Sequence, residues 1–284
     1  MSTPDDTSLT RPQYIGAKVV RREDPRLLTG AGNYVADIKR HGMVHIAFRR
    51  SDHAHATIRS VDVTAARALP GVVAVYTGKD IAALANPYQA TSRMKNYQAT
   101  FIPPLAREKV RYVGEAVVAV VAVTRYVAED ALAHIEIDYA PLPVLVDPEE
   151  SLKPDAPKLH DDLDSNILAA REFARGEVDD AFAKAAVTAG GRFHFTRTTP
   201  VTIEARASVA EYDKGARSLT LHCTTQIPGI VRDKLSEIFD LPGPRIRVIA
   251  PDVGGGFGGK TSLYSEEIVA CAVARDLGRP VKWV

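Results

Sequence analysis

Residues 254–261 read Gly254-Gly255-Gly256-Phe257-Gly258-Gly259-Lys260-Thr261, and this stretch decides between the folds that the chain could adopt. Five glycines in six positions cost conformational entropy and contribute no side-chain packing. A tight turn needs one or two glycines, whereas close approach of the backbone to a ligand accounts for five. Because an expected strand at 245–250 precedes the stretch and an expected helix at 266–277 follows it, its N–H groups could surround an anion.

Two phosphate-binding patterns also fit the stretch. Gly254, Gly256 and Gly259 satisfy GxGxxG, but no further strand–helix–strand unit and no ribose-binding acid follow. Residues 254–261 satisfy GxxxxGK[ST], the phosphate loop of nucleotide hydrolases. The sheet of such an enzyme needs further strands and an aspartate for magnesium, and little of the 284-residue chain remains after Thr261. A P-loop nucleotide hydrolase therefore stays open as the third of three possibilities.

The composition is that of an ordinary globular chain. Of its 284 residues 45% are hydrophobic and 25% are charged, and the formal net charge is +1. A near-neutral chain without a basic stripe offers no electrostatic basis for binding nucleic acid or anionic lipid. The longest apolar run, 116–123, is far shorter than the roughly 20 residues of a membrane span. Cys223 and Cys271 form neither a metal-thiolate pair nor a disulfide framework, so we expect a cytoplasmic protein.

Hydrophobic periodicity predicts an α+β fold. In the first half we expect strands at 44–48, 72–76, 111–123 and 135–139 and helices at 64–68 and 126–134. The continuous Val/Ala run that ends at residue 123 predicts burial on both faces of its strand. Thr124 is the expected N-cap of the helix that follows. The segment at 86–104 is predicted to be a long loop.

The second half follows a crossing segment at 147–166 that is rich in proline and in acidic residues, which we expect to be solvated. Beyond it we expect strands at 193–198, 208–212, 219–225, 245–250 and 281–284 and helices at 177–186, 230–239 and 266–277. On the first of these helices Val178, Phe182 and Ala185 share one face, which predicts burial of that face. Gly278 is expected to end the last helix.

Eight segments, the glycine-rich stretch among them, carry a resemblance that extends over nearly the whole chain. They are REDPRLLTG at 22–30 with Tyr34 and Asp37, RSDHAHA at 50–56, LPGV at 69–72, VRYVGE at 110–115, GEVD at 176–179, TQ at 225–226, VGGGFGGK at 253–260 and GRPVKW at 278–283. In this order they resemble the large subunit of the molybdenum hydroxylases, the family of xanthine dehydrogenase, aldehyde oxidase and carbon monoxide dehydrogenase. The last segment is similar to the carbon monoxide dehydrogenase-like branch in particular.

The resemblance implies a domain organisation and a cofactor. It divides the chain into a loose tail at 1–17, an α/β-hammerhead domain at 18–145, a linker at 146–166 and the first part of a molybdopterin-binding domain at 167–284. The implied cofactor is molybdopterin with molybdenum, as the cytosine dinucleotide. The implied partners are the remaining large-subunit chain, an iron–sulfur subunit and an FAD subunit, together with a small-molecule substrate.

The same resemblance implies a cofactor site. It places five residues of the glycine loop beside the molybdenum and the pterin: Gly255, Gly256, Phe257, Gly258 and Gly259. The family glutamine that matches Gln226 donates a hydrogen bond to an oxo ligand of molybdenum, which suits a neutral amide. From its position before Pro228, Gln226 could instead cap the next helix. Phe257 could form a wall of the substrate channel or belong to the core.

Other candidate side chains favour structural roles. His53 and His55 would share one face of a strand, but no third metal ligand lies near them in the sequence. Glu115 and Glu204 have no visible catalytic partner, and Glu204 favours an ion pair with Arg206. We therefore assign no metal-ligating side chain within the chain.

The sequence thus predicts the N-terminal portion, or a split subunit, of a molybdenum-dependent hydroxylase. Its substrate would be an aldehyde, an N-heterocycle or a CO-like molecule, and its oxygen would come from water. Thr261 replaces the acidic residue of purine-oxidising members, which disfavours a purine. The catalytic base of the family matches nothing up to residue 284, so we expect the chain alone to be inactive and the strand at 281–284 to lack its neighbours. The alternative is a non-catalytic binding or assembly module derived from the family.

Overall fold

The computed structural model describes residues 15–89, 92 and 94–284, so the expected loose tail at 1–17 lies almost wholly outside the described residues. The chain divides into two units, residues 1–33 and residues 34–284. Within the described part of the first unit lies α1 (Asp24–Leu28), which carries Pro25 in its first turn, where proline costs no hydrogen bond. The elements below belong to the second unit.

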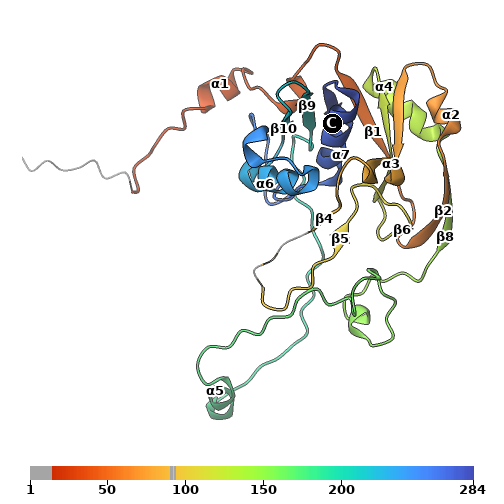
Figure 1. The fold of residues 1–284 in the computed structure, drawn as a ribbon. Coiled ribbons are helices and arrows are strands. Elements are labelled where there is room, and N and C mark those ends of the chain that lie inside the picture. The colour runs from red at the N-terminus through yellow and green to blue at the C-terminus, as the bar shows by residue number, and fades with distance from the viewer. Residues whose placement is uncertain (1–14, 90–91, 93) are drawn as a thin grey trace, which may run out of the picture. The chain divides into compact units, whose positions relative to one another are not determined.

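A seven-stranded sheet forms the centre of this unit, in the order β11-β10-β9-β12-β1-β7-β3. Figure 1 labels three of its strands, β1, β9 and β10. Its strands are β1 (Val44–Arg50), β3 (Val72–Thr77), β7 (Ala116–Ala122), β9 (Ser208–Asp213), β10 (Ser218–Cys223), β11 (Ile246–Ile249) and β12 (Val281–Trp283). Strands from both halves of the sequence therefore share one sheet.

The position of β12 corrects the expectation that the strand at 281–284 lacks neighbours. β12 pairs in parallel with β1, where Val281 lies opposite Val44, and antiparallel with β9, where Val281 lies opposite Ala210. Because it lies between two strands, both of its backbone edges are paired, and the Val281 side chain is fully buried. Sequence patterning indicates a strand but does not determine which strands lie beside it.

Strand β7 explains why the sheet has two hydrophobic faces. Every residue of the run Ala116–Ala122 is buried, as the unbroken Val/Ala pattern predicts. Successive side chains of a strand point to opposite faces. Ala119 and Val121 accordingly join one hydrophobic cluster, and Val118 and Val120 join the other.

Helices cover both faces of the sheet (Figure 1). They are α2 (Thr64–Arg67) and α4 (Arg125–Ala131) on one face and α6 (Pro228–Phe239) and α7 (Ser265–Leu277) on the other. Val231, Leu235 and Ile238 of α6 are buried, as their spacing predicts. Thr124 caps α4 by accepting a hydrogen bond from the Val127 N–H at 3.2 Å, and α7 ends at the left-handed Gly278, both as predicted.

Two smaller sheets and several short helices complete the described elements. The sheets are β6-β2-β8, with β2 (Ala56–Asp62), β6 (Lys109–Val110) and β8 (Glu136–Pro141), and the pair β4 (Tyr88–Gln89) and β5 (Phe101–Ile102). The short helices are η1 (Val35–Asp37), α3 (Gly78–Ala82), η2 (Leu132–His134), η3 (Glu150–Leu152), α5 (Val178–Lys184) and η4 (Gly243–Arg245). The β4–β5 pair lies within the segment that was predicted to be a long loop.

Two predictions for 177–203 are wrong. Helix α5 forms, but the face that we expected to be buried is open to solvent, with Phe182 64% exposed. The predicted strand at 193–198 is absent, and Phe193 and Phe195 are 84% and 91% exposed. An alternating apolar segment forms a strand only beside another strand, and none lies next to it among the described residues.

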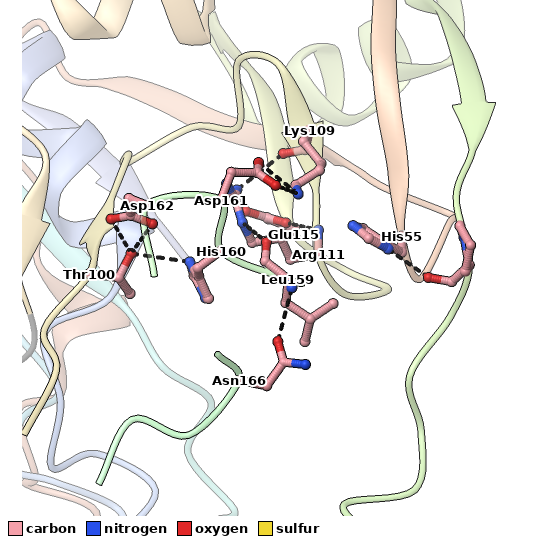
Figure 2. A network of polar contacts seen from close by, with 11 residues as sticks. His55, Thr100, Lys109, Arg111, Glu115, Leu159, His160, Asp161, Asp162 and Asn166 are labelled. Carbon is pink, nitrogen blue, oxygen red and sulfur yellow. Dashed lines mark hydrogen bonds and ion pairs between the residues drawn. The ribbon is translucent and has the colours of Figure 1, made fainter. Parts of the chain in front are cut away.

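The acidic crossing segment is attached to the first half by polar contacts (Figure 2). Lys109 Nζ lies 2.8 Å from Asp161 Oδ2, and Thr100 Oγ1 donates to Asp162 Oδ2 at 2.9 Å. The Arg111 side chain donates to the Leu159 carbonyl at 2.9 Å. Asp161 and Asp162 are exposed, as expected for solvated acids, and they also bond to Lys109 and Thr100. Within the described ranges no helix is long and apolar enough to cross a membrane.

Candidate functional site

The structure brings Gln226 into contact with the glycine loop. Gln226 follows β10, and the loop connects β11 to α7. Its Oε1 accepts hydrogen bonds from the N–H groups of Gly258 at 3.2 Å and Lys260 at 3.3 Å. Its own backbone N–H donates to the Lys260 carbonyl at 2.9 Å. The side chain is thus fixed to the loop at its oxygen end. Its role in binding a cofactor stays a prediction.

These contacts exclude the alternative that Gln226 caps the next helix. At the start of α6 the Ile227 N–H donates to Thr225 Oγ1 at 3.1 Å, so Thr225 provides the local side-chain acceptor. The Gln226 oxygen is already used by the loop.

Three loop glycines are required by the protein's own side chains. A Cβ at Gly256 would lie 2.5 Å from the Gln226 amide carbon, and a Cβ at Gly254 would lie 2.5 Å from the Glu204 Cβ. A Cβ at Gly259 would lie 2.7 Å from the Pro200 ring. Internal packing therefore accounts for much of the glycine content that the sequence analysis attributes to a ligand.

The two remaining loop glycines are explained by backbone conformation and not by side-chain packing. Gly255 and Gly258 have φ values of +98° and +89°, in the left-handed region that glycine tolerates best. A Cβ at Gly258 would meet nothing within 4 Å, so the loop faces open space there. Phe257 between them also has a positive φ, of 48°, and is 78% exposed. Phe257 is therefore not a core residue, and its role as a channel wall stays a prediction.

Lys260 points away from the open side of the loop. Its side chain is 1% exposed, and Nζ lies 3.0 Å from the Glu204 carbonyl oxygen and 3.1 Å from Glu204 Oε2. A phosphate loop needs this ammonium on the bound phosphates and a helix that begins at the end of the motif. Here α7 begins only at Ser265, and Lys260 is bonded to a carboxylate. The orientation of Lys260 and the start of α7 are therefore inconsistent with the phosphate loop of a nucleotide hydrolase.

The predicted Glu204–Arg206 ion pair is wrong, because each residue pairs elsewhere. Glu204 Oε2 accepts from the Gly254 N–H at 2.7 Å in addition to Lys260. Arg206 donates to Glu266 Oε2 at 3.1 Å and stacks over the Tyr264 ring at 3.8 Å.

The Glu266–Glu267 pair at the start of α7 was not identified from the sequence. Glu266 also accepts from Arg50 at 2.6 Å, which joins β1 to α7. Burial alone would raise the pKa of Glu266, but Arg206 and Arg50 outweigh it and lower that pKa. Burial raises the pKa of Glu267 to about 8, although the Tyr264 N–H donates to this carboxylate and by itself would lower the pKa. The sequence signal that could have identified this pair is the presence of two acidic residues in the first turn of the expected helix.

The remaining candidates have structural surroundings. His55 Nδ1 lies 2.7 Å from the Pro143 carbonyl, and the His53 ring lies 4.8 Å from the Tyr139 ring. Glu115 accepts from the Arg111 N–H at 2.6 Å, and burial raises its pKa. In the described part of the chain no group of His, Cys, Asp and Glu side chains could hold a metal ion.

Two family comparisons cover most of the chain. Residues 29–143 match the family described as aldehyde oxidase and xanthine dehydrogenase, a/b hammerhead domain, and residues 159–284 match the molybdopterin cofactor-binding domain. The chain belongs to the molybdenum hydroxylase large-subunit family. It contains hammerhead and molybdopterin-binding domain sequence in one α+β fold. The boundaries at 17, 145 and 166 stay predictions.

Individual relatives agree with this family. The chain is 42% identical to the carbon monoxide dehydrogenase large chain of Afipia carboxidovorans, with all of this chain and 36% of the relative covered. It is 37% identical to the nicotine 6-hydroxylase large subunit of Paenarthrobacter nicotinovorans, over 95% of this chain and 33% of the relative. The solved quinoline 2-oxidoreductase of Pseudomonas putida 86 superposes with a TM-score of 0.89 at 42% identity, over 95% of this chain and 34% of that one. The chain thus spans about a third of the length of these relatives.

Proposed function

We propose that the chain is the N-terminal portion, or a split subunit, of a molybdenum hydroxylase that oxidises an aldehyde, an N-heterocycle or a CO-like substrate with water-derived oxygen. The observation that carries this proposal is the orientation of the Gln226 amide. Its oxygen is held by two loop N–H groups, and its Nε2 has no partner among the described residues. A primary amide nitrogen carries two donors, so Gln226 presents fixed donors to an acceptor outside the chain.

The backbone N–H groups of the loop also suit an anionic cofactor. The N–H groups of Gly254, Gly258, Gly259 and Lys260 are used within the protein. Those of Gly255, Gly256 and Phe257 donate to no described residue. Consecutive free N–H groups in a loop with positive φ values are typical of an anion-binding concavity. A molybdopterin with its phosphate groups is such an anion.

Each part of the site would have a limited task. The bound cofactor would supply the redox chemistry, as cofactors generally do. Gln226 Nε2 would donate to an oxygen ligand of the metal, and the free N–H groups of the loop would orient the anion. Exposed Phe257 would exclude water from the substrate side. Glu204 and Glu266 are held in ion pairs, so we assign the catalytic base to the remaining large-subunit polypeptide.

The proposal includes partners that the relatives suggest. The relatives are about three times as long, and some are named as subunits of a complex. The exposed alternating apolar segment around Phe193 and Phe195 is suited to pairing with further large-subunit polypeptide. We place the iron–sulfur clusters and the FAD on other subunits, because Cys223 and Cys271 are the two cysteines of the sequence, are both buried and free, and are too few to hold an iron–sulfur cluster. The cytosine dinucleotide form and a cytoplasmic location complete the proposal.

The experiment is metal and activity analysis of the protein purified with its partners from its native host. We expect stoichiometric molybdenum and oxidation of an aldehyde, quinoline or carbon monoxide with an artificial electron acceptor. An assembled complex without molybdenum would favour the binding or assembly module. Bound ATP or GTP without molybdenum would favour the hydrolase.

A further inference from the structure

We propose that the buried ion pair of Glu204 and Lys260 positions the Gln226 amide, so that both residues act through Gln226 without contacting the cofactor themselves. The inference rests on the proposed function only in giving Gln226 its task. The positioning itself is a property of this chain and can be tested without molybdenum.

One carboxylate holds both ends of the glycine loop. Glu204 Oε2 accepts from the backbone N–H of Gly254 at 2.7 Å and from Lys260 Nζ at 3.1 Å. Lys260 Nζ also donates to the Glu204 backbone carbonyl at 3.0 Å. The first glycine and the lysine that ends the loop therefore meet at a single residue.

The backbone of Lys260 is hydrogen-bonded to Gln226 in both directions. The Lys260 N–H donates to Gln226 Oε1 at 3.3 Å, and the Lys260 carbonyl accepts from the Gln226 N–H at 2.9 Å. The Thr225 hydroxyl donates to the same carbonyl at 3.5 Å. A displacement of Lys260 would therefore move the amide that faces out of the loop.

The burial of the ion pair between Lys260 and Glu204 indicates its role. The Lys260 and Glu204 side chains are 1% and 12% exposed, and Glu204 Oε1 is buried without a partner in the described part of the chain. Replacing a buried pair by apolar groups is often neutral or stabilising, so stability alone is a poor reason to keep one. Fixing a loop in one geometry is a better reason, because directed charge-assisted hydrogen bonds specify an arrangement that apolar contacts do not.

The experiment measures amide hydrogen exchange by NMR in the 284-residue chain without cofactor. The variants are Lys260→Met, Glu204→Gln and the double variant, which leaves no buried charge stranded. The readout is the exchange rate of the Gly258 and Lys260 amides, which donate to Gln226, divided by that of Val120 in the centre of β7. A global loss of stability raises the exchange rate of Val120 at least as much as the rates of the loop amides, so it cannot by itself raise the ratio.

The matched control is Lys109→Met. Lys109 is also mostly buried, with 11% of its side chain exposed, and also pairs with a carboxylate, that of Asp161, but it lies in the hammerhead half. This variant should leave the ratio unchanged.

We expect the ratio to rise about tenfold or more in Lys260→Met and in the double variant, and less in Glu204→Gln, whose amide oxygen can still accept from Gly254. A ratio equal to that of the wild type in Lys260→Met and in the double variant would overturn the proposal, whatever their thermal stability. Failure of the proposed function would instead appear as an assembled protein without molybdenum, so the two results are distinguishable.

Discussion

Val281 lies opposite Val44 in parallel register, and this pairing places β12 between strands of the two halves of the chain. The glycine loop and α7 immediately precede β12 in the sequence. The site is therefore attached to the sheet through a strand that is itself paired on both sides.

A charge at Val281 should disrupt this connection. We expect Val281→Asp to lower the free energy of unfolding by more than ~3 kcal/mol, because the side chain is fully buried and an unpaired carboxylate would lose its hydration. Chemical denaturation measures the effect. Val146→Asp at an exposed valine is the control, and a similar small change in both variants would contradict the central position of β12.

A second stability test compares the loss of an exposed phenylalanine with the loss of a buried one. Phe195→Ala should change the free energy of unfolding of this chain by less than ~0.5 kcal/mol, because the ring is exposed. Phe239→Ala at the end of α6 should cost ~3–5 kcal/mol, because the ring is buried in the core. Equal losses would mean that the segment around Phe195 packs within the chain.

Local elements were predictable from the sequence because local spacing determines them. The Val/Ala run of β7, the apolar stripe of α6 and the Thr124 cap all formed where periodicity and capping chemistry place them. The segment at 193–198 shows the limit of the same rule. Its pattern is that of a strand, but a strand also needs a neighbour.

Pairings between distant residues were not predictable in this way. The sequence favours Arg206 as the partner of Glu204 because it is two residues away, whereas the structure selects Lys260, far along the chain. The resemblance to a family places Gln226 and the loop beside the same cofactor but does not predict the hydrogen bonds between them. Tertiary folding, which spacing does not encode, decides which charges and amides meet.

Glu267 predicts a specific pH dependence of stability. Its pKa is raised to about 8 in the fold from an ordinary 4.5, mainly by burial, so the native chain keeps a proton that the unfolded chain releases. Stability should therefore fall as the pH rises from about 5 to 8, because the unfolded state binds fewer protons in that window. Denaturation at several pH values should show this fall in the wild type and a smaller one in Glu267→Gln. Identical slopes would show that Glu267 is ionised in the fold.

The inward orientation of Lys260 predicts that nucleotides do not bind. Calorimetry with ATP and GTP in the presence of magnesium should give no heat of binding for the wild type or for Lys260→Ala, because the ammonium is held by Glu204. Micromolar binding that the substitution abolishes would restore the phosphate-loop interpretation of residues 254–261.

In the assembled enzyme Gln226→Ala should retain molybdenum and slow turnover by ~10²-fold or more, as expected for the loss of one oriented donor. Gln226→Glu should be slower still, because it places a carboxylate beside an anionic centre. Steady-state kinetics with parallel metal analysis separate loss of the donor from loss of the cofactor. Full activity of the alanine variant would remove Gln226 from the site.

The central claim is that the Gln226 amide faces the metal of a bound molybdenum cofactor, and a crystal structure of the molybdenum-loaded protein tests it most directly. We predict an oxygen ligand of molybdenum at about 2.7–3.2 Å from Gln226 Nε2, with the cofactor against the free N–H groups of Gly255, Gly256 and Phe257. Molybdenum bound elsewhere, with the Gln226 amide facing solvent, would contradict the account.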